Sequence, residues 1–124
     1  MCWCIKVEDL GVDNPPVYCS RLDGQYILES ETLEDFFNVM ACSQALFCMP
    51  YNSEGCFVCT AEQVKKIENN FQLKPYKYNT SPLTRFFGNY EDEVICLNEN
   101  DFSCQVFYAC MSEDRLEEIE AIIM

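Results

Sequence analysis

The sequence predicts an α+β fold in which helices pack on a mainly antiparallel sheet of about five strands. Segments with a two-residue hydrophobic period alternate along the chain with segments of helical period, in the order β-ββ-α-α-ββ-α. A length of 124 residues fits one domain, and 49% hydrophobic residues suffice for a packed core. We therefore expect a single acidic α+β domain over residues 1–124.

The N-terminal part predicts a strand and then a hairpin. Alternating apolar residues over 3–7 predict the first strand. Segments 17–22 and 25–29 flank Asp23-Gly24, which is typical of a two-residue hairpin turn that needs positive φ. That register predicts a core face made of Val17, Cys19, Tyr26 and Leu28.

Two helices are predicted in the middle of the chain. The first runs from about Leu33 to about Phe47, with Thr32 as its N-cap. Its predicted apolar stripe consists of Leu33, Phe36, Phe37, Met40 and Phe47. The second begins at Thr60, where Thr-Ala-Glu-Gln fits a capping box.

The last part of the chain predicts a connection, two strands and a helix. Residues 74–92, interrupted by prolines and a glycine, are expected to form an irregular basic and aromatic connection. Segments 94–97 and 102–111 are almost continuously apolar, as buried strands are. Ser112 is expected to cap a final helix that turns Leu116, Ile119 and Ile123 inward.

Charge excludes several classes of function. The chain has 21 acidic and 8 basic residues, no histidine, and a formal net charge of −13. Such a chain cannot displace counterions from a phosphate backbone, so autonomous nucleic-acid binding is excluded. Without histidine, Ser-His-Asp and Cys-His nucleophile systems are excluded as well.

The charge is unevenly distributed. Residues 1–64 carry ten acids and two bases, residues 65–90 carry one acid and five bases, and residues 91–124 carry ten acids and one base. The final helix repeats glutamates at positions 113, 117 and 120 on one side. This is either a solvated face or a surface complementary to a basic partner. The whole-chain imbalance favours the partner, because solubility needs a net charge of only about 2–8.

The candidate partner-binding residues form two groups. The carboxylates are Glu113, Asp114, Glu117, Glu118 and Glu120, then Glu91, Asp92 and Glu93, then Glu31, Glu34 and Asp35. The aromatic candidates in the 74–92 connection include Tyr76, Tyr78, Phe86 and Phe87. These aromatics either anchor a partner or fasten the connection to the core.

Ten cysteines allow a metal, a redox or a packing interpretation. Cys2, Cys4, Cys56 and Cys59 are the close pairs that could supply four thiolates to zinc. Cys2, through its own α-amino group, or Cys56, just before a helix start, could instead act as a nucleophile. The other cysteines are expected to fill the core: Cys19, Cys42, Cys48, Cys96, Cys104 and Cys110.

We therefore expect a non-enzymatic acidic binding protein or inhibitor, without a cofactor unless the zinc alternative holds. Its partner would be a basic protein such as a nuclease, a nucleic-acid-binding effector or a toxin, approached by nucleic-acid mimicry. A phage or viral counter-defence protein and a toxin-immunity protein fit this description. No apolar run reaches the roughly 20 residues of a membrane span, and the N-terminus lacks a secretory pattern. A cytoplasmic protein is expected, in the infected host cell if it is viral.

Overall fold

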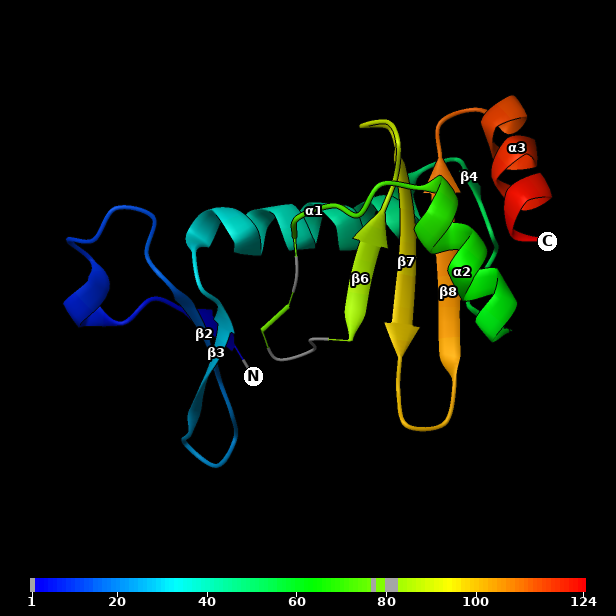
Figure 1. Cartoon of the computed structure of the whole chain (residues 1–124). Helices are drawn as coiled ribbons and strands as arrows, with labels where there is room; N and C mark the ends of the chain where they lie inside the picture. Colours follow the sequence, from blue (N-terminus) through cyan, green and yellow to red (C-terminus); the bar gives the residue numbers. More distant parts are fainter. Residues whose placement is uncertain (1, 77, 80–82) are drawn as a thin grey trace. The chain divides into compact units, whose positions relative to one another are not determined.

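A computed structural model describes residues 2–76, 78–79 and 83–124 (Figure 1). The predicted α+β class with antiparallel sheets and helices packed on them is confirmed. The chain forms two compact units. Unit 1 comprises the described residues within 1–41 and 76–82, and unit 2 comprises those within 42–75 and 83–124.

Unit 1 contains a three-stranded antiparallel sheet. Its strands, in the order β1-β2-β3, are β1 (Cys2–Cys4), β2 (Val17–Ser20) and β3 (Tyr26–Ser30). The predicted first strand is too long, since β1 ends at Cys4 and the chain turns into the 3-10 helix η1 (Val7–Asp9). The acidic pair Glu8-Asp9 lies in this short helix, where the predicted strand would have continued.

The predicted hairpin exists, but its turn has three residues and not two. Arg21 N–H donates to the Gln25 carbonyl (2.8 Å) and Gly24 N–H donates to the Arg21 carbonyl (3.0 Å). Gly24 has a φ of 82°, as the last position of such a loop requires. The extra loop residue shifts the register, so that Cys19 pairs with Ile27. A shift of one residue reverses which side chains face the core, and Tyr26 is accordingly 61% exposed.

Helix α1 (Leu33–Cys48) has the predicted length and cap but a different buried stripe. Thr32 Oγ1 accepts from the backbone N–H of Asp35 (3.1 Å). The buried positions are Val39, Cys42 and Leu46, whereas Phe37 and Phe47 of the predicted stripe are 61% and 75% exposed. Apolar residues occupy almost every side of this helix, so its periodicity alone did not identify the inner side.

Unit 2 contains the end of α1 from residue 42 onward, a five-stranded antiparallel sheet and two further helices. Its strands are β4 (Tyr51–Asn52), β5 (Phe57–Cys59), β6 (Thr84–Phe87), β7 (Glu93–Glu99) and β8 (Cys104–Cys110). The order is β4-β8-β7-β6, with β5 also paired to β8. The helices are α2 (Ala61–Asn70) and α3 (Glu113–Ile123).

The core of unit 2 lies between its sheet and the helices α2 and α3. Residues at its centre include Ile67, Phe71, Leu97, Val106, Tyr108, Ile119 and Ile123. Both predicted helix starts are confirmed. Thr60 and Gln63 form a reciprocal capping box at α2, and Ser112 Oγ accepts from the Arg115 N–H (3.2 Å) at α3.

The 74–92 segment is not wholly irregular, because it contains β6. This strand pairs with β7, placing Phe86 opposite Cys96. Part of its outer edge is covered, since Lys74 N–H donates to the Phe86 carbonyl (2.7 Å). A four-residue strand shows too few periods for sequence pattern to distinguish it from a loop. Lys77 and residues 80–82 of this segment lie outside the described residues.

Candidate functional site

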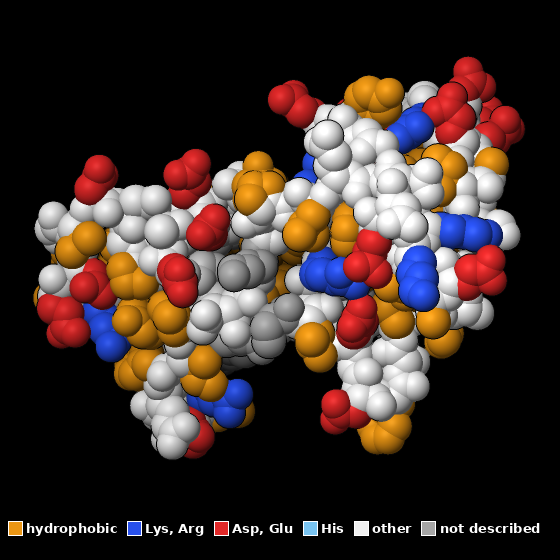
Figure 2. Space-filling view, viewed as in Figure 1, with side chains coloured by type: hydrophobic (Ala, Val, Ile, Leu, Met, Phe, Trp, Pro, Cys, Tyr) orange, Lys and Arg blue, Asp and Glu red, His pale blue; other side chains and the backbone are white. Residues whose placement is uncertain are grey.

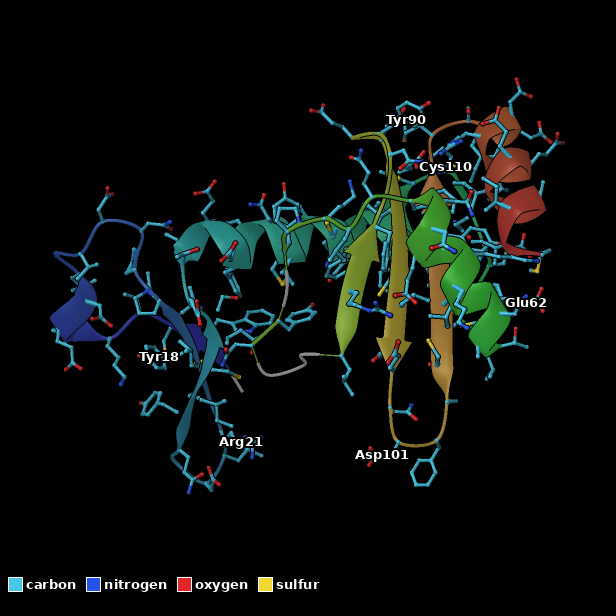
Figure 3. All side chains as sticks on the ribbon, viewed as in Figure 1. Tyr18, Arg21, Glu62, Tyr90, Asp101 and Cys110 are labelled. Atoms are coloured by element: carbon cyan, nitrogen blue, oxygen red, sulfur yellow. The ribbon has the colours of Figure 1, made fainter. Side chains whose placement is uncertain are left out.

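The candidate site lies at the end of the unit 2 sheet where β7 begins and β8 ends. Glu93, the first residue of β7, is paired with Cys110, the last residue of β8. The turn before β7 and the start of α3 therefore lie at the same end of the sheet. Figure 3 labels Tyr90 and Cys110 there, whereas Asp101 marks the opposite end.

A buried ion pair fastens this end of the sheet to α3. Arg115 Nε donates to Glu93 Oε1 (2.6 Å) and Arg115 Nη2 donates to Glu93 Oε2 (3.0 Å). Glu93 is fully buried, and its Oε2 also accepts from the backbone N–H of Asn89 (2.9 Å). The hydrogen bond to Glu93 raises the pKa of Arg115 above its ordinary value, so the guanidinium stays charged.

Arg115 also positions the turn itself. Its guanidinium carbon lies 4.9 Å from the centre of the Tyr90 ring, within cation–π range. Lys74 Nζ donates to the Tyr90 carbonyl from the other side (3.4 Å). Arg115 Nη1 donates in addition to Glu118 Oε2 (2.8 Å). The arginine thus has carboxylate partners already, and its charge is largely used within the protein.

Six of the predicted carboxylates around this framework are exposed. One of them, Glu118, is already paired with Arg115, and the other five define a surface. They belong to the turn before β7 and to the first turns of α3, together with two partly exposed apolar side chains, Tyr90 (60%) and Met111 (51%). We call this set the acidic end surface: Tyr90, Glu91, Asp92, Met111, Glu113, Asp114 and Glu117. Figure 2 shows acidic side chains gathered over α3.

Four of the predicted partner-binding residues of unit 2 are engaged inside the protein. Glu93 is paired with Arg115, and Phe86 and Phe87 are buried in the sheet. Glu120 is half-buried and accepts from the Tyr108 hydroxyl (3.0 Å). Glu93, Phe86 and Phe87 are therefore inaccessible to a partner, and Glu120 is only partly accessible. For Phe86 and Phe87, the interpretation that they fasten the segment to the core is the right one.

The remaining predicted residues lie in unit 1. Glu31 and Glu34 are exposed at the start of α1, and Asp35 is half-buried there. Asn14 Oδ1 accepts from the Glu34 backbone N–H (2.8 Å), which ties this helix start to the preceding loop. Tyr76 and Tyr78 are half-buried. The acidic end surface as defined above consists of residues of unit 2.

The two close cysteine pairs of the sequence lie in different units of the structure. Cys2 and Cys4 belong to unit 1, and Cys56 and Cys59 to unit 2. Within the described part of the chain, no three cysteine or carboxylate side chains gather in a way that could hold a metal. Cys59 ends β5 with its side chain in the core, whereas Cys56 precedes the strand and is exposed.

Several thiols of unit 2 are held in their protonated form. Burial raises the pKa of Cys96 to about 12 and also raises the pKa of Cys42 and Cys110. The pKa of Cys104 is raised to about 12, first by burial and then by its hydrogen bond with the Cys59 side chain. Thiolates are the nucleophilic form, so these four residues are poor candidates for catalysis at neutral pH.

Sequence reasoning missed the organising residue, Arg115. A signal for it existed, because Arg115 is the single base among ten acids in residues 91–124. A lone base in such a segment has a strong electrostatic reason to be paired. Which acid it pairs with depends on the β7–β8 register, and sequence alone does not show that.

Comparisons with protein-family models, with curated proteins and with solved structures found nothing that matches this chain. Among the described residues, the three helices are all too short or too polar to traverse a bilayer.

Proposed function

We propose that this chain is a non-enzymatic acidic binding protein that inhibits or sequesters a partner protein by occupying a basic surface on it. The acidic end surface is the observation that supports the proposal. Its carboxylates can pair with arginine and lysine of a partner, and they can stand in for phosphate groups that the partner normally binds. Glu113 and Asp114 also lie at the positive end of the α3 dipole, which stabilises them there.

Rigidity favours binding over simple solvation. The backbone that carries the carboxylates is held by Glu93, Arg115 and Asn89, so the attachment points of these side chains keep their spacing before a partner arrives. A preorganised surface loses less entropy on association than a mobile one. Tyr90 and Met111 add apolar area among the carboxylates, and an aromatic residue surrounded by charge resembles the anchors of protein interfaces.

The proposed partner is a protein with a basic, nucleic-acid-binding surface, such as a nuclease, a nucleic-acid-binding effector or a toxin. A small acidic inhibitor of this kind suits a phage or viral counter-defence protein or a toxin-immunity protein that acts in the cytoplasm. Long-range attraction between opposite charges would speed the encounter and make it sensitive to salt. No specific observation favours the zinc or thiol-enzyme alternatives over this proposal.

The experiment compares two triple charge reversals with the same change in net charge. The test variant carries Glu113→Lys, Asp114→Lys and Glu117→Lys. The control variant carries Glu8→Lys, Asp13→Lys and Asp23→Lys, all exposed positions of unit 1. Binding to a panel of purified nucleases and nucleic-acid-binding toxins is measured by calorimetry at about 0.05 M and about 0.5 M salt.

We expect at least one panel member to bind at low salt and to be displaced by double-stranded DNA. The test variant should raise Kd by at least about tenfold, and the control variant by less than about threefold. Equal effects of the two variants would show that net charge acts without the acidic end surface. Absence of binding across the panel at low salt would argue against a basic, nucleic-acid-binding partner altogether.

A further inference from the structure

Cys59 and Cys104 lie directly opposite each other on neighbouring antiparallel strands. β5 pairs with β8 in a register that sets these two residues as partners, although they are 45 positions apart in the chain. In the described strand pairs, no other register position places two cysteines opposite each other. The Cys59 thiol also donates to the Cys104 carbonyl (3.4 Å), so it is turned toward its partner strand.

This arrangement satisfies the distance requirement of a disulfide without backbone movement. Directly opposed residues of an antiparallel pair have Cα atoms about 4.5–5.5 Å apart. A disulfide spans Cα distances of about 4.4–6.8 Å. Cys59 is buried at the edge of the unit 2 core, and Cys104 is partly exposed beside it. Cys104 is the more exposed of the two residues, so an oxidant in solution is expected to react there first.

We propose that Cys59 and Cys104 form a reversible intramolecular disulfide, with an oxidised low-molecular-weight thiol such as oxidised glutathione as the oxidant. The small fraction of Cys104 present as thiolate attacks one sulfur of the oxidant and releases one molecule of reduced thiol, so the reaction is slow at neutral pH and faster at higher pH. Cys59 then displaces the second molecule from the mixed disulfide. The two protein thiols are oxidised to one S–S bond, and their protons end on the two released thiols.

The bond would join β5 and the start of α2 to the first residue of β8, at the end of the sheet opposite the acidic end surface. Cys59 directly precedes Thr60, the N-cap of α2, and Cys104 directly follows the turn that joins β7 to β8. β5 is a three-residue strand held at the sheet by a short register. A covalent link across a long chain separation restricts the unfolded state, so oxidation should stabilise unit 2. The proposal is independent of the proposed function.

The experiment oxidises the full chain with oxidised glutathione, alkylates the remaining thiols and maps the linked peptides by mass spectrometry. Thermal unfolding is recorded before and after oxidation and again after reduction. Cys59→Ala and Cys104→Ala are the test variants, and Cys48→Ala, an exposed cysteine at the end of α1, is the matched control. The raised pKa of Cys104 predicts faster oxidation at pH 9 than at pH 7.

We expect one linked peptide pair that joins Cys59 to Cys104, two fewer alkylated thiols, and a Tm raised reversibly by about 5–10 °C. The Tm shift should be lost in both test variants and kept in Cys48→Ala. The linkage map on the unmutated chain decides the matter even where a variant folds poorly. Three results would each overturn the proposal: Cys59 and Cys104 are still free and become alkylated, they keep a bound glutathione, or they link to other cysteines.

Discussion

Arg115 and Glu93 are 22 residues apart in the chain and meet through two hydrogen bonds, of 2.6 and 3.0 Å, inside unit 2. The carboxylate is fully buried, and the arginine side chain is 18% exposed. This pair joins the first residue of β7 to the first turn of α3. It therefore fixes the backbone that presents the exposed carboxylates of the acidic end surface.

Removal of Arg115 should destabilise the protein far more than removal of a surface arginine. Arg115→Met leaves the Glu93 carboxylate buried without its main partner, which costs about 3–5 kcal/mol of unfolding free energy. Arg85→Met is the matched control, because Arg85 pairs with the more exposed Glu68 and Glu99 (3.4 and 2.7 Å). The control should lose less than about 1 kcal/mol. Urea unfolding measures both.

A double variant shows whether the loss of unfolding free energy in Arg115→Met comes from the buried Glu93 charge that is left without its partner. Adding Glu93→Gln to Arg115→Met removes that charge, so the double variant should be more stable than Arg115→Met alone. If the double variant is as unstable as the sum of the two single variants, the pair contributes through packing and not through compensation of a buried carboxylate.

Gly88 should not tolerate a side chain, although its backbone conformation is ordinary. A Cβ atom there would lie 2.8 Å from the Glu93 carbonyl and 2.9 Å from Lys74 Cε. The lysine can move but the strand backbone cannot, so Gly88→Ala should cost about 1–3 kcal/mol. Gly11, with nothing within 4 Å of its Cβ position, is the control. A Gly11→Ala change as costly as Gly88→Ala would refute this explanation in urea unfolding experiments.

The sequence predicted those elements whose signals are local. The capping box at Thr60 and the cap at Ser112 involve residues three positions apart, and both are present in the structure. The predicted length of the hairpin turn was wrong by one residue, because the glycine of Asp-Gly also suits the αL position that ends a three-residue loop. That single residue was enough to place Tyr26 on the exposed side.

The sequence predicted that the segment of the candidate site is acidic, but not which of its acidic residues are exposed. The sequence showed that residues 91–124 are acidic, but it did not separate the exposed Glu91 from the buried Glu93, two positions away. The distinction depends on the contact that Arg115 of α3 makes with Glu93 of β7. Likewise, Cys59 faces Cys104 and not Cys56, its neighbour in the Cys-Phe-Val-Cys motif. Long-range pairing and packing determine both the burial of Glu93 and the position of Cys59 opposite Cys104, and no local pattern encodes them.

Stability should fall at alkaline pH because buried groups keep their protons in the folded state. Burial raises the pKa of Cys96 from 9.0 to about 12. Burial, and then the hydrogen bond to Glu120, raises the pKa of Tyr108 from 10.0. Below pH 9 both groups are protonated whether the chain is folded or not, and their stabilising contribution is complete. Above pH 9 the unfolded chain releases protons that the folded chain retains, so stability falls as pH rises.

The Cys96 contribution to this loss can be isolated. Between about pH 9 and pH 12 a single such group lowers stability by up to about 1.4 kcal/mol per pH unit. Cys96→Ala should therefore make the decline of unfolding free energy between pH 9 and pH 10.5 shallower. Cys48→Ala, at an exposed position, should leave the decline unchanged. Equal slopes in Cys96→Ala and the unmutated protein would contradict the assignment.

The acidic face of α3 should oppose the stability of its own helix. Glu113, Glu117 and Glu120 follow one another at four and three positions, so their like charges repel across successive turns. Glu117→Lys replaces three repulsions, from Glu113, Asp114 and Glu120, with three attractions and should stabilise the protein by about 0.5 kcal/mol at low salt, less at high salt. Glu62→Lys in the first turn of α2, which removes a favourable dipole interaction and adds repulsion from Lys65 and Lys66, should destabilise it. Urea unfolding at two salt concentrations distinguishes these signs.

If the proposed function holds, Glu117→Lys should also weaken partner binding, because the charge that destabilises α3 is the charge that the partner recognises.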